Sequence, residues 1–202
     1  MKKKKFTLHL KVSTGLHIGV GSDKLQIGGV DNPFIKDPVS LRPYIPGSSM
    51  KGKLRCLLET EASEFNGELD DKLNLYFGAT PAYLKDKKKD SNESATRLIF
   101  RDIFLSDDHK KMYDNGSLQT EIKTEIKIDR KKGTAEGGAL RTTERIPPDT
   151  EFIGEILVRH SSDNELKEIK SALDKALSLL NNDYLGGSGS RGYGAIEVKL
   201  GE

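Results

Sequence analysis

The 202-residue sequence has a single cysteine, Cys56, and only four histidines. One cysteine excludes a disulfide framework and a cysteine-rich zinc module, and it is typical of a protein in a reducing cytosol. The histidines lack the HxxxH-type spacing of a metal site. The length suits one domain, residues 1–202, which can bury a core without disulfides or structural metals.

Long apolar runs are also absent from the sequence. No stretch approaches the roughly 18 residues that a membrane-spanning helix needs. The basic start resembles that of a signal peptide, but an alternating segment from Phe6 to Val12 follows it instead of an apolar core. We therefore expect a soluble, cytoplasmic protein with no membrane partner.

Neither sign of charge dominates, since 33 Lys and Arg oppose 31 Asp and Glu. The distribution of charge is more informative, because phosphate binding needs local positive potential rather than a high net charge. Basic residues and glycines gather at 47–55, 130–138 and 186–194, which makes these segments candidates for phosphate contact. The charged stretch 84–96 has almost no apolar residue and is expected to be a mobile loop.

Apolar periodicity predicts an alternation of strands and helices. In chain order these are a strand at 5–13, a helix from Ser48 or Ser49 to about 62, a strand at 97–105, a strand at 152–158, a helix at 164–180 and a strand at 196–200. We expect Ser48 or Ser49 to cap the first helix. This order predicts an α+β fold with the ferredoxin-like (RRM-like) βαββαβ arrangement.

Two insertions interrupt this core. Residues 14–47 are rich in glycine and proline, and a stretch of this length without regular structure is usually functional. The second insertion, about 107–148, alternates at 118–129 and 139–146, which predicts the arms of a long hairpin around an irregular segment at 130–138. The core itself is then expected to comprise 5–13, 48–105 and 150–200.

Two segments nearly match nucleotide-binding motifs. Gly47 to Leu54 has the GxxxxGK pattern of a P-loop, but Leu54 replaces the Mg-binding Ser or Thr and no buried strand precedes it. Gly187 to Gly192 satisfies GxGxxG, yet it follows a helix and enters a strand, the reverse of the dinucleotide-binding order. Neither is a coenzyme site.

The same two segments suit phosphate binding. On the first helix, Lys51 and Arg55 share one edge of the apolar stripe and Lys53 flanks the other, near an N-terminus that favours anions. In the glycine-rich loop, Arg191 can pair with phosphate and Tyr193 can stack on a base. The alternatives are an ordinary amphipathic helix with a solvated basic face and a flexible connection before an edge strand.

Asp31 is the candidate for catalysis, in a Gly-Gly-Val-Asp-Asn-Pro sequence with Asp37 six residues later. A carboxylate in an exposed, unusual loop can bind a divalent ion or orient a nucleophile. An Asp beside Asn-Pro is more often a turn former, and His17 is likewise more often a hydrogen-bonded structural histidine. No Ser/His/Asp triad or carboxylate pair competes with Asp31.

Taken together, several stretches resemble the RAMP proteins of CRISPR systems, and more narrowly the repeated backbone subunit of the type III-A (Csm) effector complex. The stretches that carry the resemblance are 15–19, 27–37, 44–55, 128–130, 140–141, 144–147 and 186–194. The resemblance implies that copies stack into a helical filament along a CRISPR guide RNA, together with other type III-A effector subunits. It also implies a ferredoxin-like palm and a thumb hairpin, at about 118–146, that wedges into the duplex of guide and complementary target RNA.

The resemblance further implies an RNA-guided, divalent-metal-dependent endoribonuclease that cuts target RNA at regular intervals. Asp31 is then the catalytic residue, which either holds the metal or helps deprotonate the ribose 2′-hydroxyl. The metal, Mg or Mn, binds only together with RNA. The implied RNA-binding residues are His17, Ser49, Lys51, Lys53, Arg55, Arg130, Gly187, Gly189, Arg191 and Gly192. Alternatives are a cap on the 5′ end of the guide, a stand-alone endoribonuclease that processes the guide precursor, and a non-catalytic RNA-binding assembly subunit.

Overall fold

The computed structural model describes residues 1–20, 29–62, 68–79 and 96–201, and its centre is an antiparallel sheet. The strands follow the order β2-β4-β7-β1-β8, and β3 also pairs with β7. They are β1 (Lys2–Val12), β2 (Tyr44–Ile45), β3 (Leu98–Phe100), β4 (Ile103–Leu105), β7 (Glu151–His160) and β8 (Ile196–Gly201). With a helix after β1 and another after β7, this is the predicted βαββαβ palm.

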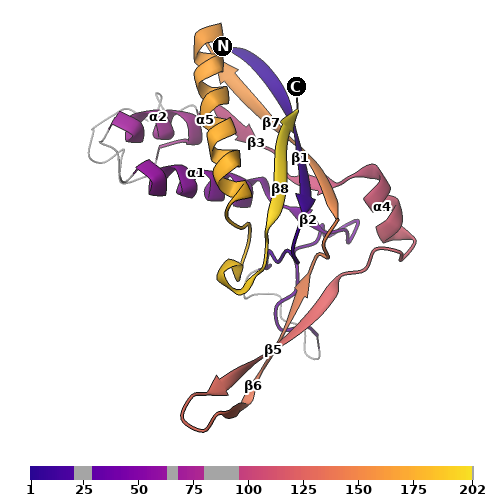
Figure 1. Cartoon of the computed structure of the whole chain (residues 1–202). Coiled ribbons are helices and arrows are strands. Elements are labelled where there is room, and N and C mark those ends of the chain that lie inside the picture. The colour runs from indigo at the N-terminus through magenta and orange to yellow at the C-terminus, as the bar shows by residue number, and fades with distance from the viewer. Residues whose placement is uncertain (21–28, 63–67, 80–95, 202) are drawn as a thin grey trace.

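Helices α1 (Gly47–Ala62) and α5 (Asp163–Asn181) cover one face of the sheet, and α2 (Glu68–Phe77) packs beside α1 (Figure 1). They cover this face because β1 alternates, with Phe6, Leu8, Leu10 and Val12 each at most 2% exposed beneath them. The α5 stripe predicted from periodicity is confirmed, since Ile169, Leu173, Leu177 and Leu180 are buried. Within the described ranges, no helix is long and apolar enough to cross a membrane.

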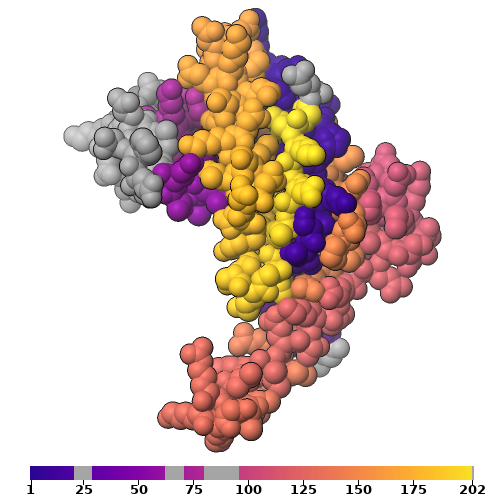
Figure 2. Space-filling view, in the orientation of Figure 1, coloured from indigo at the N-terminus to yellow at the C-terminus, as the bar shows by residue number. Residues whose placement is uncertain are grey.

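The hairpin of β5 (Glu121–Asp129) and β6 (Thr134–Arg145) is a separate two-stranded sheet, called the thumb below. It projects away from the palm (Figures 1 and 2). The prediction that 130–138 is irregular is wrong beyond residue 133, because β6 already begins at Thr134. Strand pairing thus extends into the glycine-rich segment on this exposed hairpin.

The first helix begins differently from the prediction. The Gly47 N–H donates to the Asp102 carboxylate (2.8 Å), and the Ser49 N–H donates to the Pro46 carbonyl (3.0 Å). A side chain at Gly47 would collide with the backbone carbonyls of Phe100 and Arg101. The expected cap by Ser48 or Ser49 is therefore wrong. The acceptor at the start of the helix is instead the carboxylate of Asp102, which lies between β3 and β4.

Other elements were not predicted. The strand expected at 97–105 is divided into β3 and β4, and α2, β2 and α4 (Asp107–Asp114) were missed. Helix α4 has no fully buried residue, and Met112 and Tyr113 are its two apolar residues, too few to mark a repeating stripe in the sequence. The loop expected to be mobile at 84–96 lies outside the described residues, except for Thr96.

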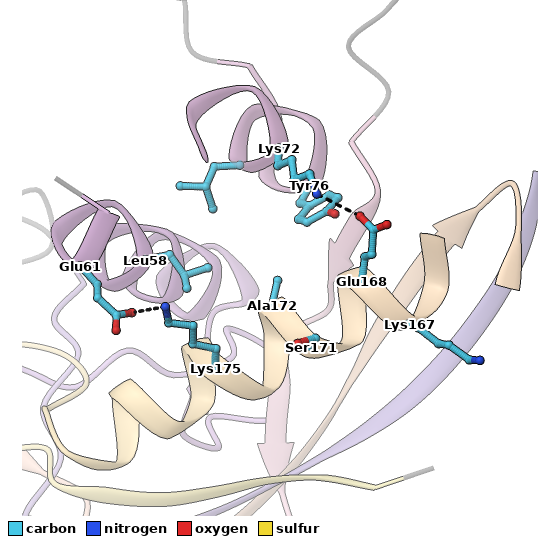
Figure 3. Close-up of a pocket in the computed structure, with 10 residues that line it drawn as sticks. Leu58, Glu61, Lys72, Tyr76, Lys167, Glu168, Ser171, Ala172 and Lys175 are labelled. Atoms are coloured by element: carbon cyan, nitrogen blue, oxygen red, sulfur yellow. Dashed lines mark hydrogen bonds and ion pairs between the residues drawn. The ribbon is translucent and has the colours of Figure 1, made fainter. Parts of the chain in front are cut away.

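A groove of about 620 Å³ lies between α1, α2 and α5 (Figure 3). Leu58, Tyr76 and Ala172 contribute its apolar floor, and two ion pairs cross it, Lys72–Glu168 (3.1 Å) and Lys175–Glu61 (3.0 Å). Its lining shares no residue with the loop that carries Asp31.

Candidate functional site

Asp31 lies where the 14–47 insertion meets the base of the thumb. Its Oδ2 accepts hydrogen bonds from the Thr142 backbone N–H (2.7 Å) and the Thr142 hydroxyl (2.8 Å). Its own N–H donates to the Thr142 hydroxyl (3.0 Å). Asn32 continues the attachment, because its backbone N–H donates to the Thr142 carbonyl (3.0 Å). The catalytic candidate is thus fixed to strand β6.

The hydrogen bonds from Thr142 lower the pKa of the exposed Asp31 carboxyl, because they stabilise its charged form. Asp31 is therefore ionised at neutral pH. A general base works best when its pKa lies near the working pH. This carboxylate is better suited to hold a cation or to act through its charge than to accept a proton.

Glu144, two residues further along β6, is buried at 6% exposure and joins three segments. Its carboxylate accepts hydrogen bonds from the Phe34 N–H (2.9 Å), Lys36 Nζ (2.6 Å) and the Thr120 hydroxyl (2.6 Å). Burial alone would raise the pKa of Glu144, but these donors together lower it. Its backbone N–H also donates to the Asn32 carbonyl (2.9 Å). Glu144 therefore joins the Asp31 loop to strand β6 and to Thr120, the residue before β5.

His17 is half-buried directly beside this anchor. Its Nδ1 lies 2.8 Å from the Glu144 carbonyl, and its ring meets Phe34 edge-on with centroids 6.5 Å apart. Since a carbonyl only accepts hydrogen bonds, Nδ1 carries the proton. This geometry gives His17 a structural role at the site, and its contact with RNA stays a prediction.

The glycine-rich loop 186–194 packs against the same place. A side chain at Gly186 would overlap the His17 carbonyl, and one at Gly189 would overlap the Tyr184 ring. The loop is therefore a packed element rather than the flexible connection considered as an alternative.

Most of the backbone amides proposed to hold phosphate in this loop are occupied. The Gly187 N–H donates to the His17 carbonyl and the Gly192 N–H to the Gly189 carbonyl, both at 2.9 Å. The Arg191 side chain is 62% exposed and lies 3.8 Å from a Glu125 carboxylate oxygen. Of the groups predicted here, Arg191 is the one best placed to meet a polyanion.

Tyr193, suggested as a stacking platform, is 2% exposed. Its hydroxyl donates to Glu125 (2.7 Å), and Lys123 Nζ and Arg145 Cζ each lie 4.5 Å from its ring centre. The suggestion is wrong, because burial and these cations leave no face for a base. Tyr184 is 36% exposed, but Lys53 Nζ lies 3.9 Å from its ring centre and Gly189 packs against the ring, so it does not offer a free face either.

The three cations of α1 differ in what they already bind. Lys53 pairs with Asp183 (3.0 Å) and lies 3.9 Å from the Tyr184 ring centre. Lys51, by contrast, has no ion pair within the described part of the chain. Burial and the neighbouring Arg55 both lower the pKa of Lys51. An anion beside Lys51 would relieve this repulsion.

Arg55 is committed to the contact between α1 and α2. Its guanidinium donates to Glu59 (2.7 Å), the Gly78 carbonyl (2.5 Å) and the Asn74 side chain (2.9 Å). The side chain is 17% exposed. The structure thus gives Arg55 a packing role, and its RNA contact stays a prediction.

Arg130 lies exposed at the tip of the thumb, after β5. The thumb also exposes apolar side chains, with Ile126 at 51% and Leu140 at 60%. These two residues are paired in register, so they lie side by side on one face of the hairpin. Ile122 and Ile128 are exposed as well, at 49% and 59%.

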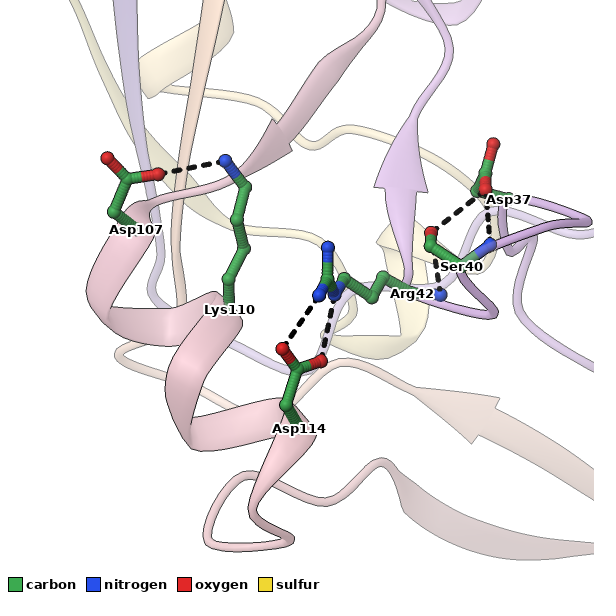
Figure 4. Close-up of polar contacts among 6 residues, drawn as sticks. All are labelled: Asp37, Ser40, Arg42, Asp107, Lys110 and Asp114. Carbon is green, nitrogen blue, oxygen red and sulfur yellow. Dashed lines mark hydrogen bonds and ion pairs between the residues drawn. The ribbon is translucent and has the colours of Figure 1, made fainter.

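Asp37 stabilises its own turn (Figure 4). Its Oδ1 accepts hydrogen bonds from the Ser40 N–H (2.7 Å), the Ser40 hydroxyl (2.9 Å) and the Val39 N–H (3.2 Å). The turn leads to Arg42, which pairs with Asp114 of α4 (2.7 Å). Among the residues that the structure describes, no three His, Cys, Asp or Glu side chains are grouped to hold a metal.

Comparison with protein-family models assigns this chain to a family. The family model of the RAMP superfamily matches residues 9–197. The chain belongs to the RAMP superfamily. Its RAMP relatives include the CRISPR system Cms endoribonuclease Csm3 of Streptococcus thermophilus, 40% identical over 96% of this chain and 86% of that protein. The protein of the same name from Methanocaldococcus jannaschii is 38% identical over 94% of this chain and 76% of that one.

Solved structures share the fold of this chain. The type III-B Cmr-beta complex in its apo state contains a chain with a TM-score of 0.67 and 18% identity, covering 97% of this chain and 96% of that one. A chain of the same complex bound to cognate target RNA has a TM-score of 0.64 and 18% identity, covering 98% and 97%. At this identity the likeness concerns the fold.

Sequence patterns missed Thr142 in this RAMP chain and assigned no role to Glu144, although Glu144 begins the stretch 144–147 that carries the family resemblance. Both stand in an alternating strand and look like ordinary strand residues. Their partners in the Asp31 loop are more than 100 positions away in the sequence, so only the folded chain brings them together.

Proposed function

We propose that this chain is the repeated backbone subunit of a type III-A CRISPR effector complex, where it binds guide RNA and cleaves complementary target RNA. Relatives named Csm3 endoribonuclease, 35–40% identical over nearly the whole chain, support the activity. The observation that carries the site is Asp31, an ionised carboxylate held by one oxygen at the base of the thumb. Copies of the chain stack in a helical filament beside other effector subunits.

In this proposal the thumb separates guide from target. The exposed pair Ile126 and Leu140 forms an apolar wedge that displaces a base pair. Arg130, at the tip of the thumb, contacts the RNA phosphate backbone. Displacement lets the ribose 2′-hydroxyl of the target line up with the adjacent phosphate. The 2′-oxygen then bonds to phosphorus as the bond to the 5′-oxygen breaks. The 2′-oxygen loses a proton and the 5′-oxygen gains one.

A divalent cation, Mg or Mn, fits the site only together with RNA. Asp31 offers carboxylate oxygen, the donor such ions prefer, but the described residues do not group three His, Cys, Asp or Glu side chains there. Phosphate oxygens and water must supply the other ligands. When bound, the cation would neutralise charge that develops on the phosphate. The role of Asp31 is to hold it beside the scissile bond.

Lys51, the α1 cation without an ion pair in the described ranges, is proposed to contact the guide backbone. Lys51→Ala is expected to weaken RNA affinity whatever the sequence, and to reduce the slope of log affinity against log salt by about one. Fluorescence anisotropy with a labelled RNA at several salt concentrations measures both. Lys111→Ala on α4, 77% exposed, is the matched control and should bind normally. If the slope of log affinity against log salt is equal for the two variants, Lys51 does not contact the RNA backbone.

The function is tested by purifying the tagged chain from its host, sizing the particle and sequencing its RNA. We expect a large assembly with several copies and short RNAs of defined length and common 5′ end. It should cut complementary RNA at regular intervals, stop on chelation and resume with Mg or Mn. An assembly that never cuts would indicate a structural subunit. A small particle with only precursor RNA would indicate a processing enzyme.

A further inference from the structure

Thr142 makes a reciprocal contact with Asp31 that uses both its backbone and its side chain. The Thr142 amide and hydroxyl both donate hydrogen bonds to Asp31 Oδ2, and the Asp31 N–H donates one to the Thr142 hydroxyl. No hydrogen bond from the described residues reaches Oδ1. One carboxylate oxygen is therefore held, and the other is left for a ligand.

We propose that Thr142 is a positioning residue, which fixes the Asp31 carboxylate through Oδ2 so that Oδ1 is presented to the cation and the RNA. This inference rests on the proposed function of Asp31. The hydroxyl is suited to the task, because it donates to the carboxylate and accepts from the Asp31 amide at once. A hydrogen bond to an ionised group is stronger than one between neutral groups.

Because Thr142 lies in the thumb, its contact with Asp31 joins the thumb to the proposed catalytic carboxylate. Thr142 belongs to β6, and Glu144 on the same strand anchors the Phe34 and Lys36 end of the loop. The hairpin proposed to displace the base pair therefore also sets the position of the carboxylate. The lowered pKa of Asp31 agrees with this arrangement, since its causes are the Thr142 amide and hydroxyl.

Cleavage by the assembled complex at saturating target RNA tests the inference. Thr142→Val keeps the shape and the backbone amide but removes the hydroxyl, and we expect the single-turnover rate to fall on the order of tenfold. Target affinity should stay unchanged, and Thr142→Ser should restore the rate. Thr124, the direct cross-strand neighbour of Thr142, gives the matched control Thr124→Val, which should cut normally.

The outcomes separate this inference from the function on which it rests. If Asp31→Asn abolishes cutting while Thr142→Val cuts at the normal rate, only the role of Thr142 is overturned. The same holds if Thr142→Ser fails to rescue, since the hydroxyl would then not be the active feature. If Asp31→Asn itself cuts normally, both proposals fall.

Discussion

Replacing Asp31 by asparagine is expected to abolish target cleavage without loss of assembly or RNA binding. Asparagine keeps the size of the side chain, and its carbonyl oxygen can still accept from the Thr142 amide and hydroxyl. The charge that attracts a cation is lost. Removal of a positioned charged or acid–base group typically slows a reaction by about 10²–10⁴-fold. Single-turnover cutting of a labelled target by the purified complex measures this effect.

Asp37→Asn is the matched control for this experiment. Asp37 belongs to the same insertion, but its carboxylate is occupied by the turn that it caps. We expect the Asp37→Asn complex to cut at the normal positions and rate. Cutting by Asp31→Asn at those positions would place the active site elsewhere, and equal losses in both variants would indicate a general effect on the insertion.

The palm was predictable because its elements repeat a local pattern. Burial of one face of β1 forces the alternation from Phe6 to Val12, and the helix at 164–180 shows its stripe for the same reason. Helix α4 was missed because none of its residues is fully buried and only Tyr113 packs against the core. A local signal did exist, since Ser106 caps the helix and Asp107 and Asp108 occupy its first turn.

The candidate site was predictable only in part. Asp31 was reached through resemblance, because its loop alone favoured a turn former over a catalytic residue. Lys51, Lys53 and Arg55 look equivalent in the sequence, yet only the fold brings Asp183 to Lys53 and Asn74 to Arg55. Such pairings join residues from different elements, so periodicity contains no information about them.

The second large effect is expected at Glu144, the buried anchor of the Asp31 loop. Glu144→Ala leaves the Lys36 ammonium and the Phe34 amide without their acceptor. The Lys36 side chain is 32% exposed, so water can partly replace the carboxylate there, and loss of these hydrogen bonds typically costs about 1–3 kcal/mol. We expect the free energy of unfolding in urea to fall by about this amount, and cleavage to be lost because the loop detaches from β6. Glu136→Ala, at an exposed pair on the same strand, should change stability by less than about 0.5 kcal/mol.

The pH dependence of Glu144→Gln distinguishes the charge of Glu144 from its shape. Because the folded protein holds the pKa of Glu144 below its ordinary value of 4.5, the ionised carboxylate stabilises the fold above that pH. This contribution fades as the pH falls below 4.5 toward the lowered pKa. The wild-type protein should therefore exceed Glu144→Gln in stability at pH 7, and the difference should shrink in acid. A difference that stays constant from pH 7 to pH 3 would mean that Glu144 acts through packing, and that the charge of Lys36 contributes little to holding the Asp31 loop.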